Sequence, residues 1–306
     1  MMSERKRVSR AQRERIYLNS GGKCQKCGDA IDIDLFHVAH LRSHANGGPA
    51  VDENLEAWCL PCNWAQGSAD VRDTRAVPRG WQQDALATIV KRITNDQVAT
   101  LSAAPGAGKT IFSGLTFQML RDNDVVDRMV VMVPRRNLVE QWVAELQSAC
   151  HIDLKGNATV HRPSQHGVVV TYQSLTAYSI NNHQAMAADS RTLLVLDEVH
   201  HVGEKMHTES AAWARNVKAV AGEVDNNVNV AGVLNLSGTL WRSNDRERIS
   251  TVRYIDLGGH RIQAIADAEK TAKELIQEYH LRPIDLFRLG ARVEISELAA
   301  ESVTES

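Results

Sequence analysis

The residues of this chain best suited to chemistry form the run Ala-Ala-Pro-Gly-Ala-Gly-Lys-Thr at positions 103–110. An apolar stretch before it (98–102) predicts a strand, and an apolar-periodic stretch after it (111–120) predicts a helix. In that setting, backbone N–H groups and the helix N-terminus can hold phosphate oxygens. The lysine can reach the β- and γ-phosphates, and the threonine hydroxyl can hold Mg²⁺. The predicted nucleotide-phosphate residues are Gly106, Gly108, Lys109 and Thr110.

An acidic pair follows a second apolar stretch. Residues 192–196 predict a strand that runs directly into Asp197 and Glu198. An isolated Asp-Glu pair at a strand end is usually a solvated turn, but this pair lies a few βα units beyond a phosphate loop. There, Asp197 can hold Mg²⁺ through its water shell and Glu198 can polarise the attacking water.

Four of the five cysteines form two pairs with the spacing of metal ligands, Cys24/Cys27 and Cys59/Cys62. Two such pairs predict a closed tetrahedral Cys₄ zinc site, and four unliganded thiols are the minor alternative. A segment this short buries little core, so zinc would supply much of its folding free energy.

Histidine and asparagine residues stand between and beside these cysteines. Residues 37–41 read His-Val-Ala-His-Leu, Asn54 precedes the second pair, and Asn63 follows it. This pattern resembles an HNH endonuclease of the ββα-metal type. The resemblance implies that His40 is the general base, that Asn54 orients the hairpin loop and His40, and that Asn63 ligates a divalent ion. A near-neutral histidine base and one hard cation suit phosphodiester hydrolysis.

One position departs from that family pattern. Ala39 stands where the family often has a metal-binding aspartate. His37 faces the same side of the strand as Ala39, since side chains alternate, and is a candidate replacement ligand. The alternative is a zinc-stabilised DNA-binding module without hydrolytic activity.

The elements that must position the nucleotide motifs alternate between strands and helices. Strands are predicted at 129–133, 168–171, 192–196 and 233–236, and each ends in polar residues. Near-continuous apolar strands between helices predict a parallel sheet covered on both faces. Ligands of such sheets bind at the carboxyl ends of the strands, where these polar motifs lie.

The order of motifs over residues 79–245 resembles the first motor domain of a superfamily-2 helicase or translocase, in the group that includes restriction-enzyme motor subunits. The resemblance implies that Gln82 reads adenine and that residues 197–200 (DEVH) form a DEAH-type box. It also implies DNA-backbone contacts by residues 134–135 and 171–174. Ser237 and Thr239 would couple nucleotide state to strand binding. The implied cofactors are ATP, Mg²⁺ and, in the first module, Zn²⁺.

Composition fits a soluble globular protein. The chain has 306 residues, 43% of them apolar, and a net charge of −2. It contains neither an apolar run long enough to span a membrane nor a signal-peptide pattern, so a cytoplasmic location is expected. The first fifteen residues are locally basic, and they either track phosphates or form a solvated surface segment.

We expect five parts along the chain. They are a basic arm (1–20), an HNH zinc module (21–68), a linker (69–78), an ATP-binding RecA-like domain (79–258) and a C-terminal extension (259–306). Residues 260–280 are expected to form a long amphipathic helix, and residues 283–287 a strand. Helicase relatives continue here into a second motor domain, and its arginine-bearing motif is not found after residue 282.

The sequence therefore predicts an α/β protein, a RecA-like P-loop domain preceded by a small zinc-stabilised ββα-metal module. The predicted function is that of an enzyme acting on DNA, an HNH endonuclease joined to a helicase-type ATPase that is incomplete in this chain alone. The alternative is a catalytically incomplete DNA- and nucleotide-binding module. In that case a separate chain would carry the second motor domain.

Overall fold

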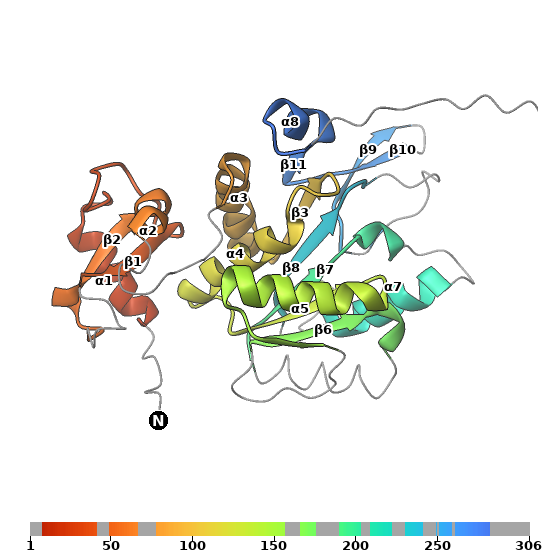
Figure 1. Cartoon of the computed structure of the whole chain (residues 1–306), viewed down its shortest axis with the longest axis horizontal. Helices are drawn as coiled ribbons and strands as arrows, with labels where there is room; N and C mark the ends of the chain where they lie inside the picture. Colours follow the sequence, from red (N-terminus) through yellow and green to blue (C-terminus); the bar gives the residue numbers. More distant parts are fainter. Residues whose placement is uncertain are drawn as a thin grey trace, which may run out of the picture.

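The computed structural model describes residues 8–41, 49–66, 78–156, 166–175, 190–202, 209–221, 230–240, 249, 251–258 and 261–281 (Figure 1). Several predictions fall outside these residues. They concern the first part of the basic arm (1–7), residues 42–48 and 67–68 of the predicted zinc module, residues 69–77 of the predicted linker and everything after residue 281. No helix among the described residues combines the length and the apolar character needed to cross a membrane.

The N-terminal module is a hairpin between two helices. Helix α1 (Arg10–Asn19) precedes strand β1 (Phe36–His40), and a 3₁₀ turn, η2 (Asp52–Asn54), leads into β2 (Leu55–Cys59) and α2 (Leu60–Gln66). The two strands are antiparallel. The module has a small core of its own, made chiefly by Ile16, Ile31, Phe36, Leu55, Ala57 and Trp58. The predicted ββα order is thus present.

The second part of the chain is built on a seven-stranded sheet in the order β11-β3-β8-β7-β4-β6-β5, in which every neighbouring pair is parallel. This confirms the predicted RecA-like parallel-sheet architecture. Its strands are β3 (Val98–Ala103), β4 (Arg128–Val133), β5 (Leu154–Gly156), β6 (Gly167–Thr171), β7 (Thr192–Leu196), β8 (Val230–Ser237) and β11 (Ala268–Lys270).

Helices cover both faces of this sheet. Successive side chains of a strand point to opposite faces, so one strand can contribute to two hydrophobic clusters. Val131 and Val133 of β4 belong to one hydrophobic cluster, whereas Val130 and Met132 belong to another. The first cluster contains α3 (Gly80–Asp96), α4 (Lys109–Asp122) and α5 (Arg136–Cys150), and the second contains α7 (Glu209–Ala221).

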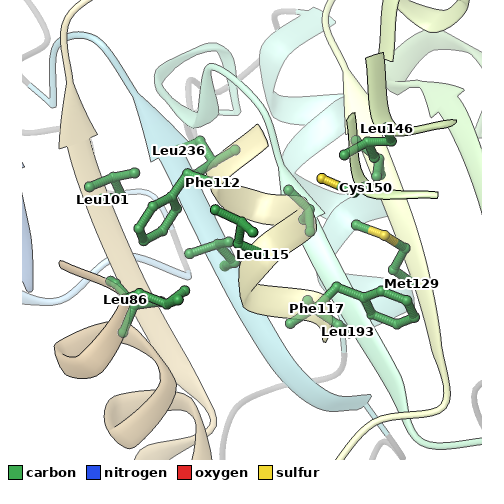
Figure 2. Packing of buried hydrophobic residues seen from close by; sticks show 14 of the residues in the cluster. Leu86, Leu101, Phe112, Leu115, Phe117, Met129, Leu146, Cys150, Leu193 and Leu236 are labelled. Atoms are coloured by element: carbon green, nitrogen blue, oxygen red, sulfur yellow. The ribbon is translucent and has the colours of Figure 1, made fainter. Parts of the chain in front are cut away.

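Helix α4 carries much of the first cluster. Figure 2 shows Phe112, Leu115 and Phe117 of α4 between strand residues such as Leu101 and Leu193 and residues of α5 such as Leu146. Phe112 and Phe117 are fully buried. The helix that starts at the phosphate loop is therefore fixed along its length by the core.

The prediction of a long helix over residues 260–280 is wrong. After β9 (Tyr254–Gly258), the segment forms β10 (Arg261–Ala264), β11 and the short helix α8 (Ala272–Gln277). Tertiary pairing overrides the local pattern, because β11 joins the sheet beside β3. The Asp267 carboxylate accepts a hydrogen bond from the Thr100 backbone N–H at 2.8 Å, and Thr271 caps α8.

The N-terminal module touches the far end of α4. The Asn123 side chain donates to the Asp34 carbonyl at 2.6 Å, and His37 Nδ1 lies 3.5 Å from Asp122 Oδ2. Leu60 of α2 and Leu35 pack into the cluster that contains α4. Apolar packing and polar contacts thus join the two parts.

Candidate functional site

The phosphate loop lies between β3 and α4, as predicted. Two glycines shape it, because Gly106 has φ +78° and Gly108, the residue before the helix, has φ +90°. A Cβ atom at Gly108 would also lie 3.1 Å from Gln82 Nε2. The loop is therefore a close cradle of backbone, which fits the binding of phosphate groups.

Lys109 links this loop to the acidic motif. Its ammonium donates to Glu198 Oε1 at 2.9 Å and to the Ala103 carbonyl at 3.1 Å. Burial alone would raise the pKa of Glu198, but the hydrogen bond and charge of Lys109 outweigh it and hold that pKa below its ordinary value. Glu198 is thus ionised at neutral pH.

Asp197 follows β7 directly and is buried. Burial and the neighbouring charge of Glu198 raise the pKa of Asp197 to about 6, against the lowering effects of Lys109 and of a hydrogen bond from Trp142. A buried carboxylate and a second, lysine-paired carboxylate at the end of one strand form a donor set that fits a hydrated divalent cation.

A third motif contacts the other carboxylate oxygen of Glu198. His200 Nδ1 lies 2.9 Å from Ser237 Oγ and 3.3 Å from Glu198 Oε2, and the Gly238 backbone N–H donates to Glu198 Oε2 at 3.3 Å. The Ser237 hydroxyl also accepts from the Thr239 backbone N–H at 3.1 Å. The structure thus joins the 237–239 segment to the acidic motif.

Gln82 lies beside the same loop from helix α3. Its amide nitrogen donates to the Gly108 carbonyl at 3.3 Å, and its amide oxygen accepts from the Arg79 backbone N–H at 2.9 Å. Thr110, the second residue of α4, is half-buried. The predicted nucleotide residues therefore converge on one edge of the sheet.

Sequence reasoning missed two groups at this site, and it placed Tyr172 in a segment expected to contact DNA (171–174) rather than beside Asp197. Trp142 Nε1 donates to Asp197 Oδ2 at 3.2 Å, and the Tyr172 hydroxyl donates to the Asp197 carbonyl at 2.9 Å. In the sequence, Trp142 could be identified only as an apolar position of a predicted helix.

The second group is the segment around β11. The Ala104 N–H donates to the Lys270 carbonyl at 3.0 Å. Leu281 also packs at Gly106, because Leu281 Cδ2 lies 2.9 Å from the position that a Cβ atom of residue 106 would take.

The four paired cysteines form one cluster. Their sulfur atoms all lie within 4.8 Å of one another, and those of Cys27 and Cys59 are 3.7 Å apart. Zn–S bonds of about 2.3 Å in a tetrahedron place sulfurs about 3.8 Å apart, so the donor set fits zinc. Burial opposes ionisation of Cys24, but backbone N–H groups of the knuckles lower its pKa to about 6.

The predicted nuclease residues lie on the hairpin and on α2. His40 ends β1, and the Leu41 N–H donates to the Asn54 carbonyl at 2.9 Å, while the Asn54 side chain donates to the Pro49 carbonyl at 2.9 Å. Asn63 lies on α2, which packs against both strands. His37 lies 3.5 Å from Asp122 of the other part.

Two protein families match this chain. The family described as "Type III restriction enzyme, res subunit" matches residues 75–242, more than half of the chain. The family described as "HNH endonuclease" matches residues 24–68. These two segments coincide with the nucleotide site and with the cysteine cluster described above.

Individual proteins are similar over parts of their length. An uncharacterised protein of Mycobacterium leprae is 27% identical over 80% of this chain and 37% of its own. A protein of Haloarcula marismortui, provisionally described as the DNA 3′-5′ helicase Rad25, is 27% identical over 47% of this chain and 22% of its own. This chain thus spans well under half the length of these curated relatives.

Among solved structures, the DNA-bound, ATP-dependent Type ISP restriction-modification enzyme LlaBIII is 16% identical, with a TM-score of 0.45 over 71% of this chain and 17% of its own. The chain belongs to the family of the Type III restriction enzyme res subunit, and its residues 24–68 match the HNH endonuclease family.

Proposed function

We propose that this chain is an ATP-dependent DNA helicase- or translocase-type protein with an N-terminal HNH endonuclease module. The observation that carries the nucleotide part is the 2.9 Å contact between Lys109 and Glu198. It brings the phosphate loop and the acidic motif, 89 residues apart in sequence, into one site.

In the proposed motor, the chain's own groups bind and orient. Lys109 and the backbone of the glycine loop hold phosphate oxygens, and Gln82 recognises the adenine edge. Thr110 and Asp197 would hold Mg²⁺, which would supply positive charge beside the transferred phosphoryl group. Glu198, ionised through Lys109, orients and polarises a water molecule. The 237–239 segment couples the nucleotide state to strand binding. Gly238 contacts Glu198 directly, and Ser237 contacts His200, which also contacts Glu198.

In the proposed nuclease, His40 accepts a proton from water. Asn63 ligates a divalent ion, and Asn54 holds the hairpin that presents His40. We retain His37 as a candidate ligand of that ion. The four cysteines bind zinc and keep the module folded. The description of the matched family as an endonuclease supports a nucleic-acid substrate, and the DNA helicase description of the archaeal relative supports DNA.

Nucleotide binding by two variants tests the motor. Lys109→Ala should weaken the affinity for Mg²⁺–ATP at least tenfold, because it removes the phosphate-facing charge. Glu198→Gln should leave that affinity within about twofold and lower any turnover by about 10²-fold, as expected for loss of a group that activates water. Titration of a fluorescent ATP analogue measures the first effect, and phosphate release measures the second. Equal binding by wild type and Lys109→Ala would refute the nucleotide site.

Nicking of supercoiled plasmid tests the nuclease. His40→Ala should abolish divalent-dependent nicking and leave DNA binding nearly unchanged, because a general base acts on the chemical step. Asn63→Ala should lose activity that excess metal partly restores. Nicking that persists in His40→Ala would refute the assignment of the base.

A further inference from the structure

Asp197 is held by three elements other than its own strand. The Trp142 indole of α5 donates to its carboxylate at 3.2 Å. The Tyr172 hydroxyl, just after β6, donates to the Asp197 carbonyl at 2.9 Å. The Asp197 backbone N–H donates to the Met132 carbonyl of β4 at 2.9 Å. Trp142 and Tyr172 are both buried, at 2% and 0% exposure.

The chemistry of an indole suits this contact. An indole has one N–H donor and no acceptor, so it can fix one oxygen of a carboxylate without competing for a cation. A hydrogen bond to Oδ2 thus restricts rotation of the carboxylate, and the indole does not occupy Oδ1. Groups that orient metal-binding carboxylates in this way control metal affinity although they never touch the metal.

The burial of Trp142 alone does not account for the contact. A phenylalanine would fill most of the same apolar volume, but it would leave the buried Asp197 charge without this donor. The position of α5 adds a second argument. The helix begins at Arg136, two residues after Pro134. The Pro134 carbonyl accepts a hydrogen bond from the Gln173 side chain at 2.9 Å, and Gln173 is the neighbour of Tyr172. The two segments that hold Asp197 are therefore bonded to each other.

We propose that Trp142 is a positioning residue for Mg²⁺–nucleotide binding, acting through Asp197, and that Tyr172 fixes the backbone of the same residue. This inference rests on the proposed ATP-binding function. Helix α5 thereby controls the metal dependence of nucleotide binding through Trp142, which does not itself bind the metal.

The test is a magnesium titration of the full chain with an imido-bridged, non-hydrolysable ATP analogue. Trp142→Phe should raise the Mg²⁺ concentration for half-saturation about tenfold, the usual effect of losing a group that orients a ligand. Its affinity for the analogue in EDTA should stay within about twofold of wild type. A purely structural defect would lower both affinities together, so the split between them separates the two explanations.

Trp81→Phe is the matched control. Trp81 is also buried in the cluster that contains α4, and it stacks on Phe112 with ring centroids 6.0 Å apart. It should leave the magnesium titration unchanged. If Trp142→Phe does not fold, Tyr172→Phe keeps the test open, because it removes one hydroxyl and retains the ring that stacks on Trp213. It should shift the magnesium midpoint in the same direction.

The outcomes are distinct. Wild-type protein without Mg²⁺-dependent binding would overturn both the proposed function and this inference. Normal wild-type binding, with Trp142→Phe or Tyr172→Phe folded and unshifted, would overturn the positioning role alone. A shift of the magnesium midpoint without loss of EDTA affinity would establish it.

Discussion

At the scale of single residues, Asp197 combines burial with a neighbouring charge, and both disfavour its ionised form. The charge of Lys109 and the hydrogen bond from the Trp142 indole oppose this effect. A carboxylate kept ready for a cation in this way destabilises the fold while no cation neutralises it. That cost should be measurable as a dependence of stability on pH.

The first prediction concerns this pH dependence. Because the pKa of Asp197 is raised to about 6 in the folded protein, this residue keeps a proton that the unfolded chain loses near pH 4. Its contribution to stability is therefore fully present below pH 4 and is lost as pH rises to about 6. Asp197→Asn should match wild type near pH 4 and be more stable by up to about 3 kcal/mol at pH 7.5. Urea unfolding in EDTA measures the difference, and a gap that does not change with pH would contradict the argument.

Residue-level prediction succeeded where a motif has a fixed local form. The glycine loop, Lys109 and the Asp197-Glu198 pair could be placed on one sheet edge from the sequence, because each directly follows an apolar strand. Trp142 and Tyr172 could not be assigned to the site, since their hydrogen bonds depend on how α5 and β6 pack against β7. The Lys109–Glu198 contact likewise depends on the strand order, which the sequence does not contain.

At the scale of elements, the predicted strands at 129–133, 168–171, 192–196 and 233–236 are all present in the sheet. Long apolar runs define buried strands well. The three-residue strands β5 and β11 were not predicted, because such short segments show no period and depend on a neighbour for pairing. The helix predicted over residues 260–280 was wrong for the same reason, since apolar spacing alone does not distinguish short strands from a helix.

Gly167 provides a prediction at this scale. It begins β6 with φ +153°, and a Cβ there would stand 1.8 Å from the Met129 carbonyl oxygen of β4. No side chain can be accommodated without moving the strand, so Gly167→Ala should destabilise the protein by about 3 kcal/mol or more. Gly28→Ala offers a control, because no atom lies within 4 Å of a Cβ there although its φ is also positive. Thermal unfolding distinguishes them, and equal losses would show that φ alone decides the effect.

The zinc module gives another prediction. Its own core is small, so the four sulfur–metal bonds should provide most of its stability. Cys59→Ala should unfold the first seventy residues and release the metal, while nucleotide affinity changes less than about twofold. Zinc analysis together with amide hydrogen exchange checks both parts. Well-folded protein without zinc would contradict it.

At the scale of the whole molecule, one helix contacts both candidate sites. Helix α4 begins at Lys109 in the phosphate loop and ends at Asp122, 3.5 Å from His37 of the zinc module. Fourteen residues of helix span about 21 Å. Because its middle is packed into the core, the helix holds the two sites at a fixed separation.

This contact yields the last prediction. Asn123→Ala removes the hydrogen bond to the Asp34 carbonyl and should destabilise the zinc module by about 1 kcal/mol, while nucleotide affinity stays the same. Faster transfer of zinc to a chromogenic chelator measures the effect. Gln141→Ala, which removes a surface contact on α5, is the control and should not change the rate.

The arrangement of β3 has a consequence for how the chain folds. Both sheet neighbours of this strand come from far along the sequence, since Thr100 bonds to Asn235, 135 residues away, and to Asp267, 167 residues away. Contacts so distant in sequence form late and slowly, because a long loop must close first. Strand β3, which leads into the phosphate loop, is thus synthesised early. It can pair with both of its sheet neighbours only after residue 270 has left the ribosome. During synthesis, the zinc module can fold and bind its metal long before the same chain can hold a nucleotide.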